Sequence, residues 1–279
     1  MDAARVRNGI LETPDVLGII AGNGVYPRLL AQSARAAGVK TIVAAAFTGE
    51  TDTALEKDVD VLEWLRVGQL GRLLNFFREQ NVGRAIMAGQ IAPKNLFDLR
   101  PDVKALVLLA RLKQRNAESI FEAIADEMAK ANMVLLPATS YLEQFLAPSG
   151  VIAGPKLSRR ETRDVDFGWK IAKEIGRLDI GQTVVVRNGT VLAVEAFEGT
   201  NEALKRGGAL ARKGAVMVKV AKPNQDMRFD VPVIGPETIR AAEDANIRVI
   251  AVEAGRTLLL EKETLIEMAA RSNISLFAR

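Results

Sequence analysis

Hydrophobic positions in the first half of the chain follow two alternating patterns. Short apolar runs predict buried β-strands, and stretches with apolar residues three or four positions apart predict helices that bury one face. Strands are predicted at residues 16–21, 41–47 and 84–88, and helices at residues 27–37, 70–80 and about 117–131. Strands that alternate with helices favour a parallel sheet with helices on both faces.

The second half of the chain has a different pattern, in which a hairpin is mixed with helices. Apolar runs at residues 183–187 and 190–196 flank Asn188-Gly189, a strong signal for a two-residue hairpin turn. Further strands are predicted at residues 215–220, 247–252 and 257–260, and helices at residues 167–175, from 199 onward, and 236–245. Asp166 is predicted to cap the first of these helices. This mixture predicts an α+β domain.

Together, the two patterns predict an α/β protein of two domains. The N-terminal domain, residues 1–134, is predicted to be a Rossmann-like parallel-sheet domain. The C-terminal domain, residues 135–279, is predicted to be a mixed α/β (α+β) catalytic domain. The connecting region contains Pro137, Pro148, Gly150, Gly154 and Pro155, and it leaves the boundary open between about residue 133 and residue 147.

The amino-acid composition restricts the available chemistry. Hydrophobic residues make up 48% of the chain and charged residues 26%, which is typical of a globular protein. The chain contains neither Cys nor His, which excludes thiolate nucleophiles, zinc–thiolate sites and imidazole catalysis. Titrating groups must therefore come from Asp, Glu, Lys, Tyr or the termini. Any metal bound by the protein would have oxygen ligands, which favours Mg²⁺, Mn²⁺ or Ca²⁺ over zinc or copper.

The charge and the terminal sequence indicate the surroundings of the protein. A net charge of +4 suits an anionic ligand or membrane face and is too small to indicate nucleic-acid binding. Because the N-terminus lacks the apolar core of a signal peptide, a cytoplasmic protein is expected, with at most peripheral contact with the inner membrane. Residues 103–115 suggest a basic amphipathic helix with Lys104, Arg111, Lys113 and Arg115, although a core-facing helix with a solvated basic side is the favoured interpretation.

A glycine loop follows the first predicted strand. Gly22-Asn23-Gly24 lies between that strand and a helix that has Pro27 in its first turn. Backbone amides at such a position attract phosphate, and glycine lets a ligand approach closely. The third glycine of the dinucleotide fingerprint is absent, so NAD binding is not predicted. The motif alone supports a phosphate contact and a tight turn without a ligand equally well.

Polar residues gather at the ends of predicted strands in the second half, at residues 178–182, 194–200 and 218–230. The third stretch carries charges of both signs: Lys219, Lys222, Asp226, Arg228 and Asp230. Cations can neutralise the oxygens of a pyrophosphate, and carboxylates can hold a metal or position water. The alternative is a solvated loop with ordinary surface ion pairs. Pro223 and Pro232 would stiffen the segment, which favours a functional loop.

Six segments share motifs with a known family. They are residues 18–24, 87–90, 179–182, 193–200, 222–232 and 252–255, and they extend over nearly the whole chain. Lys-Pro-Asn-Gln-Asp-Met-Arg-Phe-Asp at residues 222–230 is the longest and most specific. By these motifs the chain resembles the UDP-2,3-diacylglucosamine pyrophosphatases of the LpxI type, from lipid A biosynthesis.

The resemblance implies an enzyme that uses Mg²⁺ or Mn²⁺ to hydrolyse the pyrophosphate of UDP-2,3-diacylglucosamine. The products would be UMP and 2,3-diacylglucosamine 1-phosphate. The implied partner is this lipid-linked nucleotide sugar, reached by transient peripheral contact with the inner membrane; assembly into a homodimer is left open. The alternative function is a non-catalytic sensor of nucleotide sugars or lipids on the same fold.

Carried over residue by residue, the resemblance suggests three sets of site residues. The catalytic set is Asp226, Lys219, Lys222 and Arg228. The substrate-binding set is Gly22, Asn23, Gly24, Gln90, Gln182, Thr200 and Gln225. The metal-binding set is Asp226, Asp230, Glu195 and Glu198. Asn201 departs from the family, which usually has Asp after Glu-Gly-Thr; an Asn can coordinate a metal through its oxygen but cannot act as a base.

Overall fold

The computed structural model describes residues 6–7, 10–11, 13–91, 101–112, 117–212 and 214–279. The chain divides into two compact units, Met1–Tyr141 and Leu142–Arg279. This division lies within the range of residues 133–147 that the sequence left open, a few residues after the boundary drawn between residues 134 and 135. Most of the polar N-terminal stretch lies outside the described residues, as do Lys113 and Arg115.

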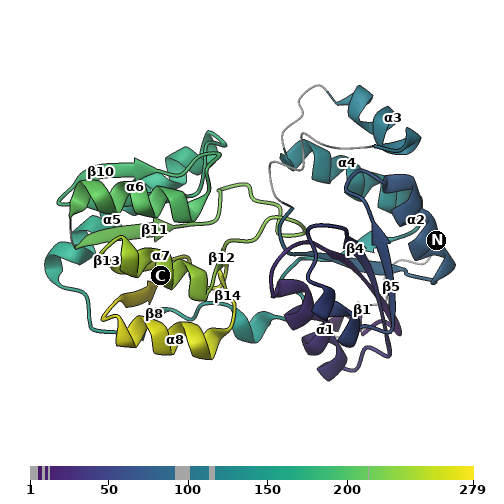
Figure 1. Ribbon diagram of the computed structural model, residues 1–279, viewed down its shortest axis with the longest axis horizontal. Helices are drawn as coiled ribbons and strands as arrows, with labels where there is room; N and C mark the ends of the chain where they lie inside the picture. The colour runs from purple at the N-terminus through teal and green to yellow at the C-terminus, as the bar shows by residue number, and fades with distance from the viewer. Residues whose placement is uncertain (1–5, 8–9, 12, 92–100, 113–116, 213) are drawn as a thin grey trace. The chain divides into compact units, whose positions relative to one another are not determined.

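The first unit contains a parallel sheet of five strands (Figure 1) in the order β5-β4-β3-β6-β7. Their bounds are Val16–Ala21 for β3, Thr41–Phe47 for β4, Val61–Leu65 for β5, Arg84–Ala88 for β6 and Val134–Leu135 for β7. In this order β4 and β5 lie on one side of β3, and β6 and β7 lie on the other. Because crossovers between parallel strands are right-handed, connections in the two directions place helices on opposite faces of the sheet. The predicted N-terminal parallel sheet is confirmed. A short antiparallel pair, β1 (Val6–Arg7) and β2 (Ile10–Leu11), precedes it.

The helices of the first unit connect these strands. They are α1 (Tyr26–Ala36), α2 (Leu70–Glu79), α3 (Val103–Arg111) and α4 (Ala117–Lys130), with a 3₁₀ turn, η1, at Thr53–Lys57. Pro27 lies in the first turn of α1, as predicted. Because both faces of the sheet are covered, β3 and β4 are buried along almost their whole length, which explains their continuous apolar sequences.

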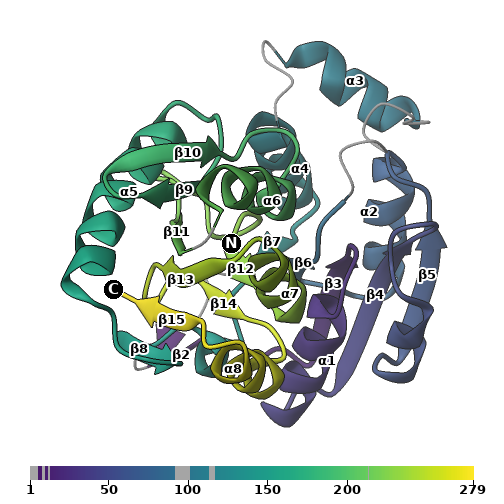
Figure 2. The same cartoon turned by 60° about the vertical axis from the view of Figure 1, so that its left-hand side comes forward.

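The second unit contains a mixed sheet of six strands (Figure 2) in the order β10-β9-β11-β13-β15-β8. The bounds are Gly150–Ala153 for β8, Thr183–Arg187 for β9, Thr190–Val194 for β10, Ala215–Lys219 for β11, Ile247–Val252 for β13 and Ser275–Ala278 for β15. Strands β11, β13 and β15 are parallel to one another, and β9 and β8 flank them in the antiparallel sense. A separate parallel pair is formed by β12 (Val233–Ile234) and β14 (Leu258–Leu259).

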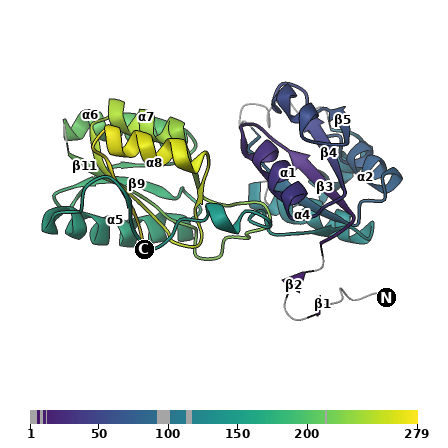
Figure 3. The ribbon, with the colours of Figure 1, turned by 90° about the horizontal axis from the view of Figure 1, so that it is seen from below.

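Helices cover both faces of this sheet. Figure 3 shows α5 (Arg159–Arg177) on one face and α6 (Thr200–Ala211), α7 (Pro236–Asp244) and α8 (Lys262–Arg271) on the other. Successive residues of each strand alternate between two apolar clusters: Val184 and Val186 pack with residues of α5, whereas Val185 packs with residues of α6, α7 and α8. The mixed α/β domain predicted for the second half is confirmed.

Most predicted elements agree with the structure, but the bounds of one helix, its cap and the bounds of one strand differ. The hairpin at Asn188-Gly189 is confirmed, with positive φ angles of 53° and 70° at its two turn residues. The predicted helix at residues 167–175 is too short, because α5 starts at Arg159, and its cap is wrong: Ser158 and Glu161 form a capping box. Asp166 instead lies within α5 and pairs with Arg279.

The third difference is the predicted strand at residues 257–260, of which only Leu258–Leu259 is a strand, and it lies outside the main sheet. The sequence patterns did not indicate several elements that complete the two units, among them β5 and β7 in the first unit and β8, β12, β15 and α8 in the second. Within the described part of the chain, none of the helices is both long and apolar enough to cross a lipid bilayer.

Candidate functional site

Strands β10, β11 and β13 of the second unit end at the same edge of the sheet, and β9 begins there. Val194 of β10 pairs with Val184 of β9, and Lys219 of β11 pairs with both Thr183 of β9 and Val252 of β13. The residues that follow β10 and β11 and precede β9 are therefore neighbours in space. These are the polar stretches that the sequence analysis singled out, and sheet ends of this kind commonly carry ligand sites.

A hydrogen-bonded chain links three of the predicted residues at this edge. The Lys219 ammonium donates to the Thr200 hydroxyl at 2.8 Å, and that hydroxyl donates to Glu195 Oε1 at 2.7 Å. Lys219 and Glu195 are each only 7% exposed. Burial lowers the pKa of Lys219, and the negative charges of Glu195 and Asp230 oppose that shift. The sheet edge therefore holds a buried lysine that can give up its proton more readily than one in water.

Several buried polar atoms around this chain lack a hydrogen-bond partner within the described residues. They include Gln182 Oε1, Thr183 Oγ1, Glu195 Oε2 and Gln225 Nε2. A buried polar group without a partner costs about 1–3 kcal/mol, so such groups normally bind water or a ligand. The first three of these atoms belong to neighbouring residues. Gln182 precedes Thr183 in the chain, and the Glu195 N–H donates to the Thr183 carbonyl. This concentration marks the sheet edge as a site for a polar ligand.

The loop at residues 220–232 follows β11 and carries the remaining charged candidates. Arg228 binds Asp226 through its side chain, with Nη2 to Oδ2 at 2.6 Å and Nε to the two oxygens at 3.0 and 2.9 Å. The backbone N–H of Arg228 also donates to Asp226 Oδ1 at 2.9 Å. These bonds hold the pKa of Asp226 below its usual range, so Asp226 is a carboxylate at neutral pH.

Asp230 lies in a contrasting environment at the end of the same loop. Burial raises the pKa of Asp230, and the positive charges of Lys222 and Lys219 oppose this shift. The side-chain amide of Gln225 also lies close to Asp230 and opposes the rise of its pKa. Gln225 Nε2 nevertheless forms no hydrogen bond of normal geometry with a described residue. The loop thus contains one carboxyl that is readily ionised and a second that retains a proton to higher pH.

Two further contacts shape the start of the loop. The Lys222 ammonium forms an ion pair with Asp179, which precedes β9. The backbone N–H of Lys222 donates to Gln225 Oε1 at 2.7 Å. Lys222 and Gln225, both predicted from the sequence, are therefore held together in one turn next to Asp179.

Two residues that the site prediction missed fix the loop to the sheet. Glu253 Oε2 accepts hydrogen bonds from the Ala221 N–H at 2.8 Å and from Lys173 Nζ at 2.7 Å. Lys173 Nζ also donates to the Ala221 carbonyl at 2.9 Å. Both polar backbone groups of Ala221 are thus bound. Glu253 directly follows β13, so the strand-end argument applied to β10 and β11 could have identified it; Lys173 lies on α5, where the sequence carries no such signal.

The four predicted metal ligands do not form a ready cluster. Within the described ranges, no three acidic side chains lie close enough together to hold a metal ion. Asp226 is bound by Arg228, and Glu198 accepts from Arg206 and from the Ala196 N–H. The Glu198 pKa is lowered by the backbone hydrogen bond to its own amide and by Arg206. Glu195 has one buried oxygen without a partner and is the best placed of the four.

The predicted substrate-binding residues of the first unit meet where the strand order of its sheet reverses. Gly22 N–H donates to the Ala88 carbonyl and Asn23 N–H to the Gln90 carbonyl, each at 2.7 Å. A β-carbon at Gly22 would lie 2.7 Å from the Gln90 carbonyl oxygen, so only glycine fits there. Gly24 has open space beside it and a φ of 88°. Ligands of doubly wound sheets bind at such a reversal.

The predicted site residues therefore form one group in each unit. Gly22, Asn23, Gly24 and Gln90 belong to the first unit, and their loops cross at the reversal point. In the second unit, hydrogen bonds or charge interactions link Glu195, Thr200, Lys219, Lys222, Gln225 and Asp230 at or near the sheet edge. Asp226 and Arg228 form a pair on the same loop, Gln182 precedes β9, and Glu198 binds Arg206.

Comparison with known proteins associates both units with one family. Residues 16–145 match the model of the LpxI N-terminal domain, and residues 148–277 match that of the LpxI C-terminal domain. The chain is also similar to a protein of Caulobacter vibrioides named UDP-2,3-diacylglucosamine pyrophosphatase LpxI. The two are 32% identical over 274 residues, which cover 94% of this chain and 95% of the relative.

Proposed function

The chain belongs to the LpxI family, and from this premise we propose that it hydrolyses the pyrophosphate bond of UDP-2,3-diacylglucosamine. The products are UMP and 2,3-diacylglucosamine 1-phosphate, in lipid A biosynthesis. A relative that matches 94% of this chain and carries the name of a pyrophosphatase supports an enzyme. The alternative of a non-catalytic sensor has no comparable support.

The observation that carries this proposal is the group of buried polar atoms without partners beside Lys219. A diphosphate is a highly charged acceptor of hydrogen bonds, and a water molecule that attacks it needs both a donor and an acceptor. The sheet edge offers the Lys219 ammonium, the Thr183 hydroxyl and the Gln225 amide as donors, with Glu195 as an acceptor. Such a set can bind the anionic group and orient water at the same time.

The charged residues of the 220–232 loop are proposed to stabilise the transition state and to position the attacking water. Lys222 and Arg228 offset the negative charge that builds up on the phosphate oxygens in the transition state. Asp226, kept ionised by Arg228, positions the attacking water through its carboxylate. Asp230 and Lys219 have pKa values shifted toward each other, so they suit the movement of the proton released by that water.

The requirement for Mg²⁺ or Mn²⁺ is part of the proposal. The chain fits an ion that one or two of its carboxylates hold together with the substrate phosphates, which is the usual way that proteins bind Mg²⁺. Glu195 is the first candidate because its buried Oε2 has no partner in the described part of the protein, and Asp226 and Asp230 are the next. The ion would supply positive charge to the phosphate oxygens.

Substrate recognition is proposed to use residues of both units. Gly22, Asn23, Gly24 and Gln90 are assigned to it in the first unit, and Gln182, Thr200 and Gln225 in the second. A substrate with two acyl chains resides in a membrane, so the proposal includes transient peripheral contact with the cytoplasmic side of the inner membrane. A homodimer is compatible with this function and is not required by it.

A turnover assay tests the proposal directly. The chain is incubated with UDP-2,3-diacylglucosamine and with other nucleoside diphosphate sugars, with and without a chelator, and the products are identified by mass spectrometry. We expect UMP and the lipid monophosphate from the first substrate, and loss of turnover with the chelator that Mg²⁺ or Mn²⁺ restores. Binding of the substrate without any product would instead support the sensor.

Asp226→Ala tests the assignment of the site. We expect the variant to keep its circular dichroism spectrum and to lose at least about 10²-fold in turnover, the usual contribution of a group that positions or deprotonates the nucleophile. Asp166→Ala is the matched control, because Asp166 is also an arginine-paired aspartate of the second unit but lies on α5. Near wild-type turnover of Asp226→Ala would remove Asp226 from the site.

A further inference from the structure

Helix α3 of the first unit exposes three large apolar side chains to solvent. Val103 is 77% exposed, Leu106 53% and Val107 44%, whereas Ala105 and Leu108 are buried. Positions 103, 106 and 107 are three or four residues apart, so these side chains lie on one face of the helix, which Ala110 extends by another turn. A surface helix normally buries such a face. We call these four residues the apolar face of α3.

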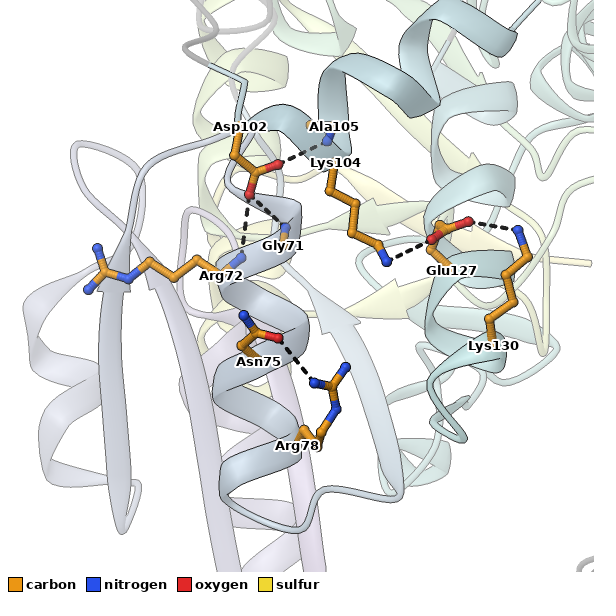
Figure 4. Close-up of polar contacts among 9 residues, drawn as sticks. All are labelled: Gly71, Arg72, Asn75, Arg78, Asp102, Lys104, Ala105, Glu127 and Lys130. Carbon is orange, nitrogen blue, oxygen red and sulfur yellow. Dashed lines mark hydrogen bonds and ion pairs between the residues drawn. The ribbon is translucent and has the colours of Figure 1, made fainter.

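Polar contacts hold α3 in place without covering this face. Asp102 caps α3, since its Oδ1 accepts from the Ala105 N–H at 2.9 Å (Figure 4). Its Oδ2 accepts from the Gly71 N–H in the first turn of α2 at 2.6 Å. Lys104 reaches across to α4 and binds Glu127 at 3.0 Å. The helix is therefore tied to α2 and to α4 through polar side chains, while the apolar face has no cover among the described residues.

Helix α3 itself carries two cations, Lys104 and Arg111, and no acidic residue between Val103 and Arg111. Arg111, in the last turn, is exposed and forms no ion pair within the described residues. Lys104 and Lys130 both pair with Glu127 of α4. A helix that exposes large apolar residues and is flanked by cations is the arrangement that binds to the surface of an anionic bilayer.

We propose that the apolar face of α3 inserts into the surface of a membrane that contains anionic lipids. The cations beside it complement the lipid headgroups, and Val103, Leu106 and Val107 enter the boundary between headgroups and acyl chains. This inference rests on the proposed function, because a diacylated substrate must be taken from a bilayer. It assigns the membrane contact to a specific surface of the N-terminal unit.

Vesicle binding of the full chain tests this inference. Wild type, the double variant Leu106→Ser/Val107→Ser and the control Leu210→Ser are sedimented with vesicles of phosphatidylcholine alone or mixed with phosphatidylglycerol. Leu210 is a suitable control because it is 64% exposed on α6 of the other unit. We expect preferential binding to the anionic vesicles, a loss of about tenfold in the double variant, and no change in the control.

Arg111→Gln separates the charge contribution from the apolar one. We expect it to lower binding to anionic vesicles about fivefold and to leave binding to phosphatidylcholine unchanged, since one cation near such a surface contributes about 1 kcal/mol. Circular dichroism checks that every variant is folded. Equal loss on both kinds of vesicle would contradict the complementarity between Arg111 and the anionic headgroups.

Two outcomes would overturn the assignment of the surface. One is a wild-type chain that does not sediment with anionic vesicles, or a double variant that binds as well as wild type. The other is a wild-type dimer in light scattering that becomes a monomer in the double variant, because a second copy would then cover the apolar face. Turnover of detergent-dispersed substrate is measured separately: its absence in wild type refutes the proposed function, while the vesicle data still decide the role of α3.

Discussion

Glu253 provides the sharpest test of how the 220–232 loop is held at the sheet edge. Its Oε2 accepts from the Ala221 N–H and from Lys173, and Lys173 also donates to the Ala221 carbonyl. Glu253→Ala removes two of these three bonds and leaves the Lys173 ammonium with only the carbonyl. The side chains of Lys173 and Glu253 are 26% and 14% exposed, so water can only partly replace what is lost.

The size of the effect follows from these contacts. A hydrogen bond to a charged group contributes about 1.5–3 kcal/mol, and breaking a fully buried ion pair costs about 3–5 kcal/mol. Because the pair is partly exposed, we expect Glu253→Ala to lower the free energy of unfolding by about 2–3 kcal/mol. Lys173→Met keeps the aliphatic stem, so we expect a smaller loss of about 1–2 kcal/mol. The double variant should lose less than the sum, with a coupling of about 1–2 kcal/mol.

Urea unfolding followed by tryptophan fluorescence measures these values. Trp169 lies in the second unit, with Lys173 Nζ 5.9 Å from the centre of its ring, and a Trp64→Phe background removes the signal of the first unit. Glu174→Ala is the control, because its ion pair with Arg177 is exposed and should contribute less than about 1 kcal/mol. We also expect kcat of Glu253→Ala to fall about 10²-fold, since a small displacement of the loop misaligns its charged groups.

If the effects of the two single changes are additive, Glu253 and Lys173 act independently, which contradicts a shared contact with Ala221. A second contradiction would be a Glu253→Ala variant that unfolds at a lower urea concentration but keeps wild-type kcat. In that case the bonds to Ala221 would stabilise the unit without positioning the loop.

Three further substitutions test other contacts. In Gly181→Ala a β-carbon would lie 2.0 Å from the Glu195 carbonyl oxygen. We therefore expect urea unfolding to show a loss of about 1–3 kcal/mol, together with lower turnover. A variant as stable as wild type would contradict this packing. Thr200→Val removes the hydroxyl between Lys219 and Glu195, and both buried groups lose this partner. We expect a loss of about 1–3 kcal/mol in urea unfolding and a fall in kcat of about 10–10²-fold, whereas unaltered kcat would exclude the hydrogen-bonded chain from the reaction. Asp102→Ala removes the cap of α3 and the acceptor of two backbone N–H groups of α2, and should cost about 1–3 kcal/mol in the unfolding of the first unit. A loss below about 0.5 kcal/mol would show that these bonds are not stabilising.

Sequence patterns predicted those parts of the fold that depend on neighbouring residues. The hairpin at Asn188-Gly189 follows from residues that adopt positive φ easily, so a dipeptide is enough to identify it. The continuous apolar runs of β3 and β4 follow from burial on both faces of a sheet. The short strand β5 was missed because its Glu63 and Trp64 are only partly buried, which interrupts the apolar run.

The candidate site was predictable in its residue types and less so in its connections. The absence of Cys and His confines the chemistry to carboxyl, ammonium and guanidinium groups and oxygen-bound metal, whatever the fold. The motif at residues 222–230 identified the loop that carries Asp226. No local pattern indicated that Arg228 engages both oxygens of Asp226 or that Asp230 is buried, because both depend on how the loop folds back.

The sequence by itself determined the alternation of strands and helices, the hairpin turn and the inventory of reactive groups, since each depends on residues close together in the chain or on composition alone. The tertiary structure decided which distant residues meet. Lys173 reaches Ala221 across 48 positions, and Asp102 caps α2 across 31. These contacts exist because strand order and helix packing bring separate segments together, and pairings of that kind leave no periodic trace in the sequence.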